Sequence, residues 1–356
     1  MIDKNFVPLK KAFLQNGWDW NESDDLFKCI SVKEKDGFWL YNYNDNVLVD
    51  RNHPVLMKCR GIVVNSAGVV FNYPFDRFFN YWEKEAADID WGSAIIQEKI
   101  DGSLCCVWHD GNDWRVSTRG SFYPQELSDV DFEQLFKKHF SKLDDLDKDF
   151  CYMFELATRQ NMIVTLYKDE GVYLIGARSK QEWGEVDYEI LDMLAKRLGV
   201  KRPRYFSASD INSCIKLFDG FRNDEEGLVV VDKYFNRVKI KQESYLKLSR
   251  IKMLKEQDIF EYVLGRQEID VEYLEKLPEV KQKIKEVRTE WDSIVLTING
   301  VFLGLKGLSS RKEFALSALK YPFKNVLFAL LDGKSVKELS LEWGVVREWC
   351  KHEDPC

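Results

Sequence analysis

Residues 98–104, with the sequence EKIDGSL, constrain the fold more than any other segment of this chain. They read as the end of one strand, a tight loop that bears Gly102, and the start of a second strand. The flanking residues 94–96 and 104–108 are apolar, and an Asp-Gly turn signal follows the second run. The sequence therefore predicts two strands joined by a short loop that presents Lys99.

A lysine on such a loop is chemically interesting only under particular conditions. An ordinary lysine has a pKa of roughly 10.4 and is protonated at neutral pH, so it cannot attack an electrophile. Desolvation or neighbouring cations lower that pKa and free the lone pair of the amine. A solvated surface turn is the simpler explanation of five residues alone, so a chemical role for Lys99 depends on the rest of the chain.

Length and composition indicate a folded protein, with either two domains or one large domain and an appendage. The chain has 356 residues, of which 45% are hydrophobic and 14% aromatic, enough for a packed core. Its net charge of −7 means that any surface for a polyanion must concentrate its basic residues in a patch.

The eight cysteines include no CxxC pair and the four histidines have no zinc-binding spacing. With no signal peptide or long apolar run, we expect no membrane contact and a cytoplasmic protein, in the host cytoplasm if it is phage-encoded.

The first 250 residues alternate between short strands and helices. An N-terminal helix and an aromatic loop are expected within residues 1–30, and an antiparallel sheet over residues 31–90. The strands expected in that sheet are 38–43, 47–49, 61–64 and 69–73. Further strands are expected at 114–118, 151–156, 172–177, 225–231 and 237–241, with helices at 126–143, 185–198 and 209–219.

Beyond about residue 250 the pattern becomes helical. Segments 251–264, 270–292 and 311–331 have helical periodicity and little strand-type alternation. We therefore predict an α+β fold: a domain over residues 1–250 built on antiparallel sheets with flanking helices, and an all-helical domain over residues 251–356. The boundary is expected near 245–255.

Several charged residues occupy strand positions where function and packing both offer an explanation. Arg60 and Arg77 each precede a predicted strand, where a guanidinium is either a solvated edge group or a phosphate ligand. Glu155 lies inside an apolar strand, which costs free energy unless it is paired or has a task. Lys239 and Lys241 project from the same face of a strand and repel each other unless an anion lies between them. A solvent-facing edge strand is the alternative for these lysines.

Taken in order, these elements form a series of six motifs: Lys99 with Asp101, Gly102 and Ser103; Arg119; Phe154 with Glu155 and Leu156; Arg178; Glu226 with Gly227; and Lys239 with Lys241. Their order and spacing resemble motifs I, Ia, III, IIIa, IV and V of the covalent nucleotidyltransferases, which include DNA ligases, RNA ligases and mRNA capping enzymes. Within that superfamily the chain resembles most the bacteriophage RNA ligase 1 family, the tRNA-repair type. No OB-fold-like strand series follows Lys241, and a helical domain stands there instead, as in this family. Arg77 departs from the family pattern, which has lysine at this position.

The resemblance implies an ATP-dependent RNA ligase that joins 3′-hydroxyl and 5′-phosphate RNA ends through lysyl-AMP and RNA-adenylate intermediates. ATP and Mg²⁺ are the implied cofactors, and RNA, in particular broken tRNA, is the implied partner, with an end-healing polynucleotide kinase/phosphatase as a further one. The C-terminal domain is then a candidate tRNA- or RNA-specificity module.

The resemblance also assigns roles to individual residues. Lys99 is the nucleophile, and Lys239 and Lys241 are expected to grip the α-phosphate and, with a metal ion, to depress the Lys99 pKa. The catalytic set is Lys99, Lys239, Lys241 and Glu226. The nucleotide-binding set is Arg60, Arg77, Phe78, Glu98, Gly102, Glu155 and Tyr245; Arg119 and Arg178 contact RNA or phosphate. The metal set is Asp101, Glu155, Glu226 and Asp270. Glu155 or Glu226 could instead bind the ribose, and Phe78 and Tyr245 could equally be packing residues.

Two alternatives stay open at this point. The first is a DNA ligase or a capping guanylyltransferase, which the choice between ATP and GTP would help to separate. The second is a non-catalytic RNA-binding protein on a ligase scaffold. The presence of Lys99, Glu155, Glu226, Lys239 and Lys241 argues against a scaffold that has lost its chemistry.

Overall fold

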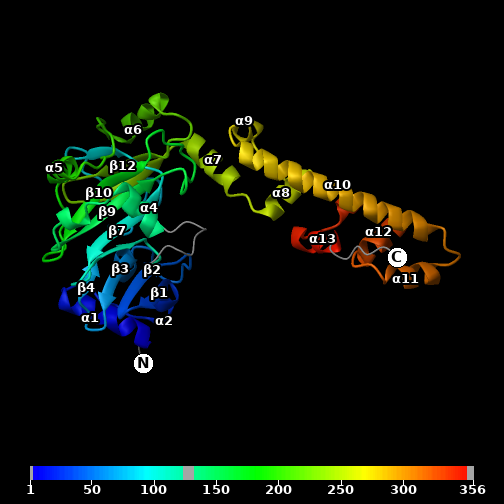
Figure 1. The fold of residues 1–356 in the computed structure, drawn as a ribbon, viewed down its shortest axis with the longest axis horizontal. Coiled ribbons are helices and arrows are strands. Elements are labelled where there is room, and N and C mark those ends of the chain that lie inside the picture. The colour runs from blue at the N-terminus through cyan, green and yellow to red at the C-terminus, as the bar shows by residue number, and fades with distance from the viewer. Residues whose placement is uncertain (1–2, 123–131, 351–356) are drawn as a thin grey trace. The chain divides into compact units, whose positions relative to one another are not determined.

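The computed structural model describes residues 3–122 and 132–350, and the chain divides into two compact units, Met1–Tyr245 and Leu246–Cys356. The division falls at the start of the 245–255 interval expected from the sequence. The first unit contains all the described strands and the second contains helices (Figure 1). The predicted α+β architecture with antiparallel sheets and C-terminal helices is confirmed.

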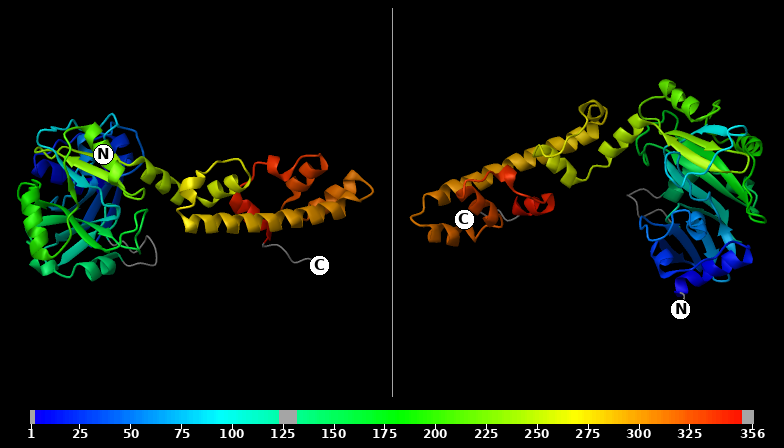
Figure 2. Two further views of the ribbon diagram at one scale, coloured as in Figure 1. Left: turned by 90° about the horizontal axis from the view of Figure 1, so that it is seen from above. Right: turned by 180° about the vertical axis from the view of Figure 1, so that it is seen from behind.

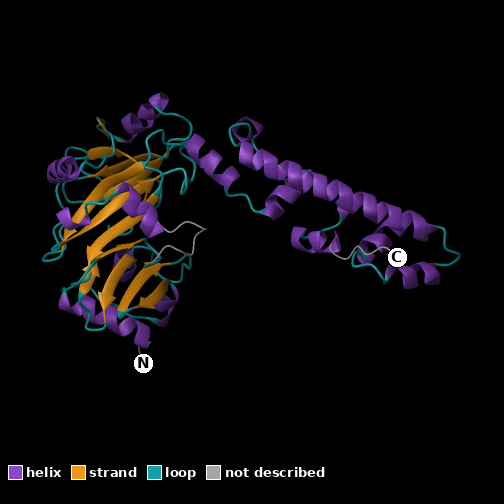
Figure 3. Cartoon of the chain, in the orientation of Figure 1, coloured by secondary structure: helices purple, strands orange, loops and turns teal. Residues whose placement is uncertain are grey.

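A four-stranded antiparallel sheet forms the N-terminal part of the first unit. Its strands follow chain order: β1 (Ile30–Lys35), β2 (Phe38–Tyr43), β3 (Arg60–Asn65) and β4 (Val70–Asn72). Helices α1 (Val7–Gln15), α2 (Asp24–Lys28) and α3 (Pro54–Lys58) flank it (Figure 3). The strand expected at 47–49 is wrong. Val47 and Leu48 are 67% and 50% exposed and lie in a loop, because no apolar face is available there to bury them.

Two further sheets complete the first unit. One has the order β10-β9-β7-β8, with β7 (Ser103–His109), β8 (Trp114–Ser117), β9 (Phe150–Ala157) and β10 (Gly171–Ser179). The other has the order β11-β6-β12-β13-β5, with β5 (Phe79–Asn80), β6 (Ile95–Glu98), β11 (Tyr205–Phe206), β12 (Gly227–Val231) and β13 (Arg237–Lys241). The strands on either side of the Lys99 loop, β6 and β7, thus belong to different sheets. The loop crosses from one sheet to the other.

Helices cover the outer faces of these sheets. Helices α4 (Phe132–His139) and α5 (Tyr188–Leu198) pack against β10, and α6 (Ile211–Leu217) lies near the third sheet. The helix expected at 126–143 is described only from Phe132, and its first residues lie outside the described part of the chain. The amphipathic stripe with Phe132, Leu135 and Phe136 is buried, as its periodicity predicted.

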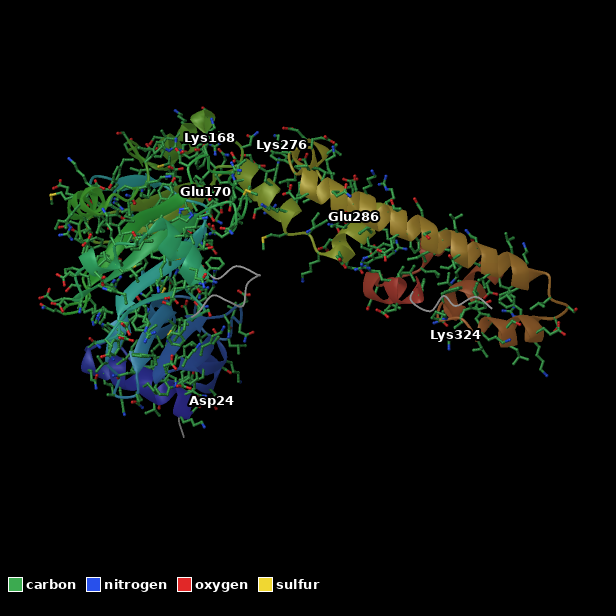
Figure 4. The ribbon with its side chains drawn as sticks, in the orientation of Figure 1. Asp24, Lys168, Glu170, Lys276, Glu286 and Lys324 are labelled. Carbon is green, nitrogen blue, oxygen red and sulfur yellow. The ribbon has the colours of Figure 1, made fainter. Side chains whose placement is uncertain are left out.

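In the second unit, the described elements of regular secondary structure are all helices, joined by loops (Figure 2). The chain enters it through α7 (Glu243–Lys252), followed by α8 (Glu256–Val263), α9 (Val271–Leu274), α10 (Pro278–Lys306), α11 (Arg311–Ala318), α12 (Lys324–Leu331) and α13 (Trp343–Cys350). Helix α10 buries apolar residues at helical spacing, and the Phe260 ring packs 5.1 Å from Trp291 and 4.7 Å from Trp343. Exposed charged side chains such as Lys276, Glu286 and Lys324 project into solvent (Figure 4). None of the described helices is long and apolar enough to cross a membrane.

Candidate active site

Lys99 follows β6 directly and is held against β12 and β13. Its backbone N–H donates to the Gly227 carbonyl at 2.8 Å, and its Nζ donates to Glu226 Oε2 at 2.7 Å. The other Glu226 oxygen, Oε1, pairs with Lys241 Nζ at 2.7 Å. The antiparallel pairing of β12 with both β6 and β13 creates this cluster, since it brings Glu226 beside a lysine that is 127 residues away in the chain.

The electrostatics of this cluster favour charged groups. Burial alone would raise the pKa of Glu226, but the ammonium groups of Lys99 and Lys241 outweigh burial and hold this pKa below its ordinary value. Burial would likewise lower the pKa of Lys99, but the carboxylates of Glu226 and Glu155 raise it. Without ligand, Lys99 is therefore a paired ammonium and no nucleophile. The expected depression is found at Lys239 instead, where burial and then the neighbouring Lys241 lower the pKa to about 8.

Glu155 is the second carboxylate of the site. It lies on β9, opposite Leu104 of β7 and Tyr173 of β10. Among the described residues its carboxylate has no hydrogen-bond or ion-pair partner. Burial, only partly offset by Lys99, raises its pKa to about 7. The pKa of Glu155 therefore lies near neutral pH, and its carboxylate is available to a ligand.

Two cavities meet at Lys99 and share Arg60, Leu104 and Glu155. The narrower has a volume of about 70 Å³, and its lining includes Phe78, Gln97 and Glu98. The wider has a volume of about 680 Å³, and its lining includes Asn42, Gly102 and Arg119. Lys99 can therefore be reached from both sides.

Phe78 forms an aromatic wall of the narrower cavity and is bordered by cations. Its ring centroid lies 5.2 Å from the Arg60 guanidinium carbon and 5.7 Å from Lys239 Nζ. Arg60 Nη1 is buried and has no hydrogen-bond partner among the described residues. An aromatic face beside an unsatisfied guanidinium suits a ligand that carries both a planar base and phosphates.

Gln97 is a site residue that the sequence analysis missed. It is 4% exposed and lines the narrower cavity, and its Nε2 finds no partner in the described part of the chain. Strand alternation would have pointed to it, because Gln97 lies two residues before Lys99 and so shares its side of the strand. Glu98 also lines this cavity, and its carboxylate accepts a hydrogen bond from Arg204 Nε at 2.8 Å.

Asp101 is hydrogen-bonded by neighbouring segments of the protein. Its Oδ2 accepts hydrogen bonds from the backbone N–H groups of Val164 and Thr165 at 2.8 and 2.7 Å, and its Oδ1 accepts from the Tyr245 hydroxyl at 2.7 Å. Both carboxylate oxygens thus accept hydrogen bonds from the protein, and the metal role of Asp101 stays a prediction. Tyr245 is 2% exposed, supports Asp101 and lines neither cavity at Lys99, so its place as a wall of the nucleotide pocket stays a prediction.

Gly102 is required by close packing. A Cβ at this position would lie 2.4 Å from the Leu156 carbonyl oxygen on β9. Only glycine lets the loop approach that strand so closely, which keeps Lys99 beside Glu155.

The predicted metal set does not form a preassembled cluster. Asp270 belongs to the second unit, where its carboxylate caps α9 by accepting from the Glu272 N–H. Within residues 3–122 and 132–350, no three His, Cys, Asp or Glu side chains are placed to hold a metal ion together. Of the four predicted metal ligands, Asp101, Glu155 and Glu226 lie near Lys99, and Asp270 lies in the second unit.

The three further arginines predicted to contact phosphate or RNA lie in different places. Arg119 lines the wider cavity, and its Nη1 donates to the Tyr43 hydroxyl at 3.1 Å. Arg77 stacks 4.1 Å from the Tyr43 ring and lines a separate cavity of about 350 Å³ that also reaches Phe78. Arg178 is 6% exposed and paired with Glu185 at 2.9 Å. Arg178 also lines the cavity of Arg77, and its contact with RNA or phosphate stays a prediction.

Comparison with known proteins identifies the family of the chain. The model of a family described as RNA ligase matches residues 58–245. A protein named as a bifunctional polynucleotide kinase/RNA ligase of Autographa californica nuclear polyhedrosis virus is 30% identical over 263 residues, which are 67% of this chain and 37% of that protein. The RNA ligase of Rhodothermus phage RM378 is 24% identical over 86% of this chain and 88% of its own length. RNA ligase 1 of bacteriophage TS2126 is 26% identical over 35% of each chain.

Solved structures with a similar chain trace include an archaeal ATP-dependent RNA ligase, 15% identical over 78% of both chains with a TM-score of 0.43. The matched family segment contains Lys99, Glu155, Glu226, Lys239 and Lys241, and thus the whole cluster described above. The chain belongs to the RNA ligase family of the bacteriophage RNA ligase 1 type.

Proposed function

We propose that this protein is an ATP-dependent RNA ligase that seals 3′-hydroxyl and 5′-phosphate RNA ends. The observation that carries the proposal is the Lys99 amine, held 2.7 Å from Glu226 at the junction of two cavities whose walls supply cations and an aromatic ring. Family membership supports the same chemistry.

The first step transfers AMP from ATP to Lys99. The Nζ lone pair forms a bond to the α-phosphorus, the bond from that phosphorus to its bridging oxygen breaks, and pyrophosphate leaves with the electron pair. The proton that Lys99 must lose passes to a carboxylate of the site, of which Glu226 touches Nζ and Glu155 is the more basic. Phe78 stacks on the base and Gln97 contacts its edge, while Arg60, Lys239 and Lys241 neutralise the phosphates.

The second and third steps involve the RNA ends. An oxygen of the 5′-phosphate attacks the phosphorus of lysyl-AMP, which breaks the phosphorus–nitrogen bond and restores Lys99. The 3′-hydroxyl oxygen then attacks the activated 5′-phosphate, AMP leaves, and the hydroxyl proton is released. The wider cavity offers the RNA ends access to Lys99, with Arg119 in its wall.

Mg²⁺ fits this site as a cation that arrives with the nucleotide. It retains most of its water and binds through one or two carboxylates together with substrate phosphates, which suits a site without a preassembled cluster. Glu155 is the carboxylate that is open to it, with Glu226 nearby. When bound, the ion neutralises phosphate charge.

Broken tRNA remains the proposed natural substrate, and the cytoplasm of the host the proposed location. The baculovirus relative is named as a kinase and a ligase in one protein, which supports an end-healing kinase/phosphatase as a partner of this chain. The helical second unit remains the candidate module for RNA specificity.

The decisive experiment is adenylylation. The wild type is mixed with ATP labelled at the α-phosphate and with Mg²⁺, and protein-bound label is measured after denaturing electrophoresis, with Lys99→Ala in parallel. We expect label on the wild type and none on the variant. Label from GTP instead of ATP would favour a capping enzyme, and no label from either nucleotide would overturn the proposal.

A further inference from the structure

Two buried polar atoms on neighbouring strands lack hydrogen-bond partners. Asn42 on β2 and Arg60 on β3 are opposite each other in the antiparallel register. Asn42 Oδ1 and Arg60 Nη1 are both buried, and neither has a hydrogen-bond partner among the described residues. An unmet acceptor beside an unmet donor costs free energy unless a ligand satisfies them.

A β-bulge creates this pairing. Tyr41 pairs with Ile62, and Asn42 then pairs with Arg60, so Gly61 is the extra residue. In a regular strand Arg60 would share the face of Ile62, which is buried in the N-terminal core. The bulge turns Arg60 to the face of Asn42 instead. Gly61 has φ +94°, and a Cβ there would lie 3.1 Å from the Arg119 backbone, so the bulge depends on glycine.

Asn42 and Arg60 lie beside the reactive lysine, Lys99. Asn42 and Arg60 both line the wider cavity, together with Lys99, Glu155 and Arg119. This cavity is separate from the one lined by Phe78 and Gln97, which is the place proposed for the base of ATP. Arg60 lines both cavities, whereas Asn42 lines only the wider one, so the two residues meet on the side of Lys99 that remains for the RNA ends.

The chemistry of the pair selects its ligand. Ionised phosphate oxygens are acceptors only, so they could satisfy Arg60 but not Asn42 Oδ1. A hydroxyl both donates and accepts, and can satisfy Asn42 and Arg60 at the same time. The nearby cations Arg119 and Lys33 suit the phosphodiester that accompanies such a hydroxyl in RNA. The 2′-hydroxyl is the group by which a protein distinguishes RNA from DNA.

We propose that Asn42, together with Arg60, binds a ribose 2′-hydroxyl at an RNA end and thereby selects RNA over DNA. The inference rests on the proposed ligase function and adds to it a specificity residue on the N-terminal sheet. The hydroxyl belongs to the terminal nucleotide of either the 3′-hydroxyl strand or the 5′-phosphate strand, and the test distinguishes the two.

The test uses the full chain with Asn42→Ala, and Asn112→Ala in an exposed turn as the matched control. Sealing is measured with a pre-adenylylated donor and a 3′-hydroxyl acceptor, each with either ribose or 2′-deoxyribose at its terminal nucleotide. Formation of lysyl-AMP is measured separately with ATP and with 2′-deoxy-ATP.

We expect the wild type to seal ribose ends faster than deoxyribose ends by about tenfold or more at one of the two termini. Asn42→Ala should slow sealing of the ribose end by a similar factor and leave the deoxyribose end unchanged, so that the preference disappears. Lysyl-AMP formation should stay within about twofold of wild type in both variants, which also shows that the variants fold.

Three results would overturn the inference. Asn42→Ala could slow ribose and deoxyribose ends equally, or have no effect on either. It could instead slow lysyl-AMP formation with ATP but not with 2′-deoxy-ATP, which would assign the hydroxyl to the nucleotide. A wild type that forms no lysyl-AMP would overturn the proposed function itself, whereas these three results leave that function standing.

Discussion

At the scale of single residues, Lys99 is protonated and therefore unreactive in the absence of substrate. Its ammonium pairs with Glu226 at 2.7 Å, and the site carboxylates raise its pKa. This pairing stabilises an otherwise costly buried charge, but the amine can attack only after its proton leaves. Without substrate, Lys99 is therefore protonated and paired with Glu226. Binding of substrate must lower the Lys99 pKa before the amine can attack.

Glu155 has the opposite effect on stability. Its pKa is raised from 4.5 to about 7, so the folded state holds a proton that the unfolded state releases between those values. Stability therefore falls as the pH rises through this window, and the penalty is complete above about pH 7. We predict that Glu155→Gln, which mimics the protonated acid, raises the free energy of unfolding at pH 8 by roughly 1–3 kcal/mol and has a much smaller effect at pH 5.

Urea unfolding at the two pH values checks this prediction. Glu272→Gln on α9, whose exposed carboxylate pairs with Lys276, is the control and should change stability little at either pH. An equal effect of Glu155→Gln at pH 5 and pH 8 would contradict the raised pKa. Adenylylation by Glu155→Gln should fall despite the greater stability, since the site loses an open carboxylate.

At the scale of elements, β13 depends on a buried ion-pair network. Glu185 pairs with Arg237 of β13 at 2.7 Å and with Arg178 of β10 at 2.9 Å, and its side chain is 9% exposed. Arg237 begins the strand that carries Lys239 and Lys241. Removing one partner of such a network leaves buried charge uncompensated. We predict that Glu185→Ala lowers the free energy of unfolding by roughly 3–5 kcal/mol.

Thermal and urea unfolding of Glu185→Ala would test this, with Glu182→Ala on the same loop as an exposed control that should change stability little. At a temperature where the Glu185→Ala variant remains folded, lysyl-AMP formation should still be slower than in the wild type, because the register of Lys239 and Lys241 depends on Arg237. A Glu185→Ala protein as stable as the control would refute the role of the network.

The elements also show what the sequence could and could not predict. Alternation placed Lys239 and Lys241 on one face, and the apolar runs located most strands, because these signals are local. The neighbours of Asp101 were not predictable in this way. Its carboxylate is occupied by amides of residues 164 and 165 and by Tyr245, which reach it only through the tertiary fold. Arg178 and Asn42 are similar cases. Distant segments bury Arg178, and a one-residue bulge sets the residue opposite Asn42.

At the scale of the whole molecule, basic residues gather in both units. The chain carries −7 overall, yet the site gathers Arg60, Arg119, Lys239 and Lys241 around Lys99. In the second unit, exposed lysines lie on and between α11 and α12, where Lys312, Lys320 and Lys324 are all exposed. A basic surface of this kind suits the backbone of a structured RNA.

If this surface holds RNA, its removal should affect long substrates and spare the chemistry. We predict that replacing Lys312, Lys320 and Lys324 together by Glu slows sealing of a nicked tRNA-sized RNA by about tenfold or more at low salt and weakens its salt dependence. Lysyl-AMP formation should be unchanged, because no residue that lines the Lys99 cavities is altered. The matched control reverses three exposed lysines of the first unit, Lys148, Lys196 and Lys216, and changes the net charge by the same amount. If both triple variants lose the same activity, net charge alone explains the effect, and the second unit has no particular role in binding RNA. If only the first variant loses activity, and loses less on a short single-stranded RNA, the second unit is the part of the protein that recognises structured RNA.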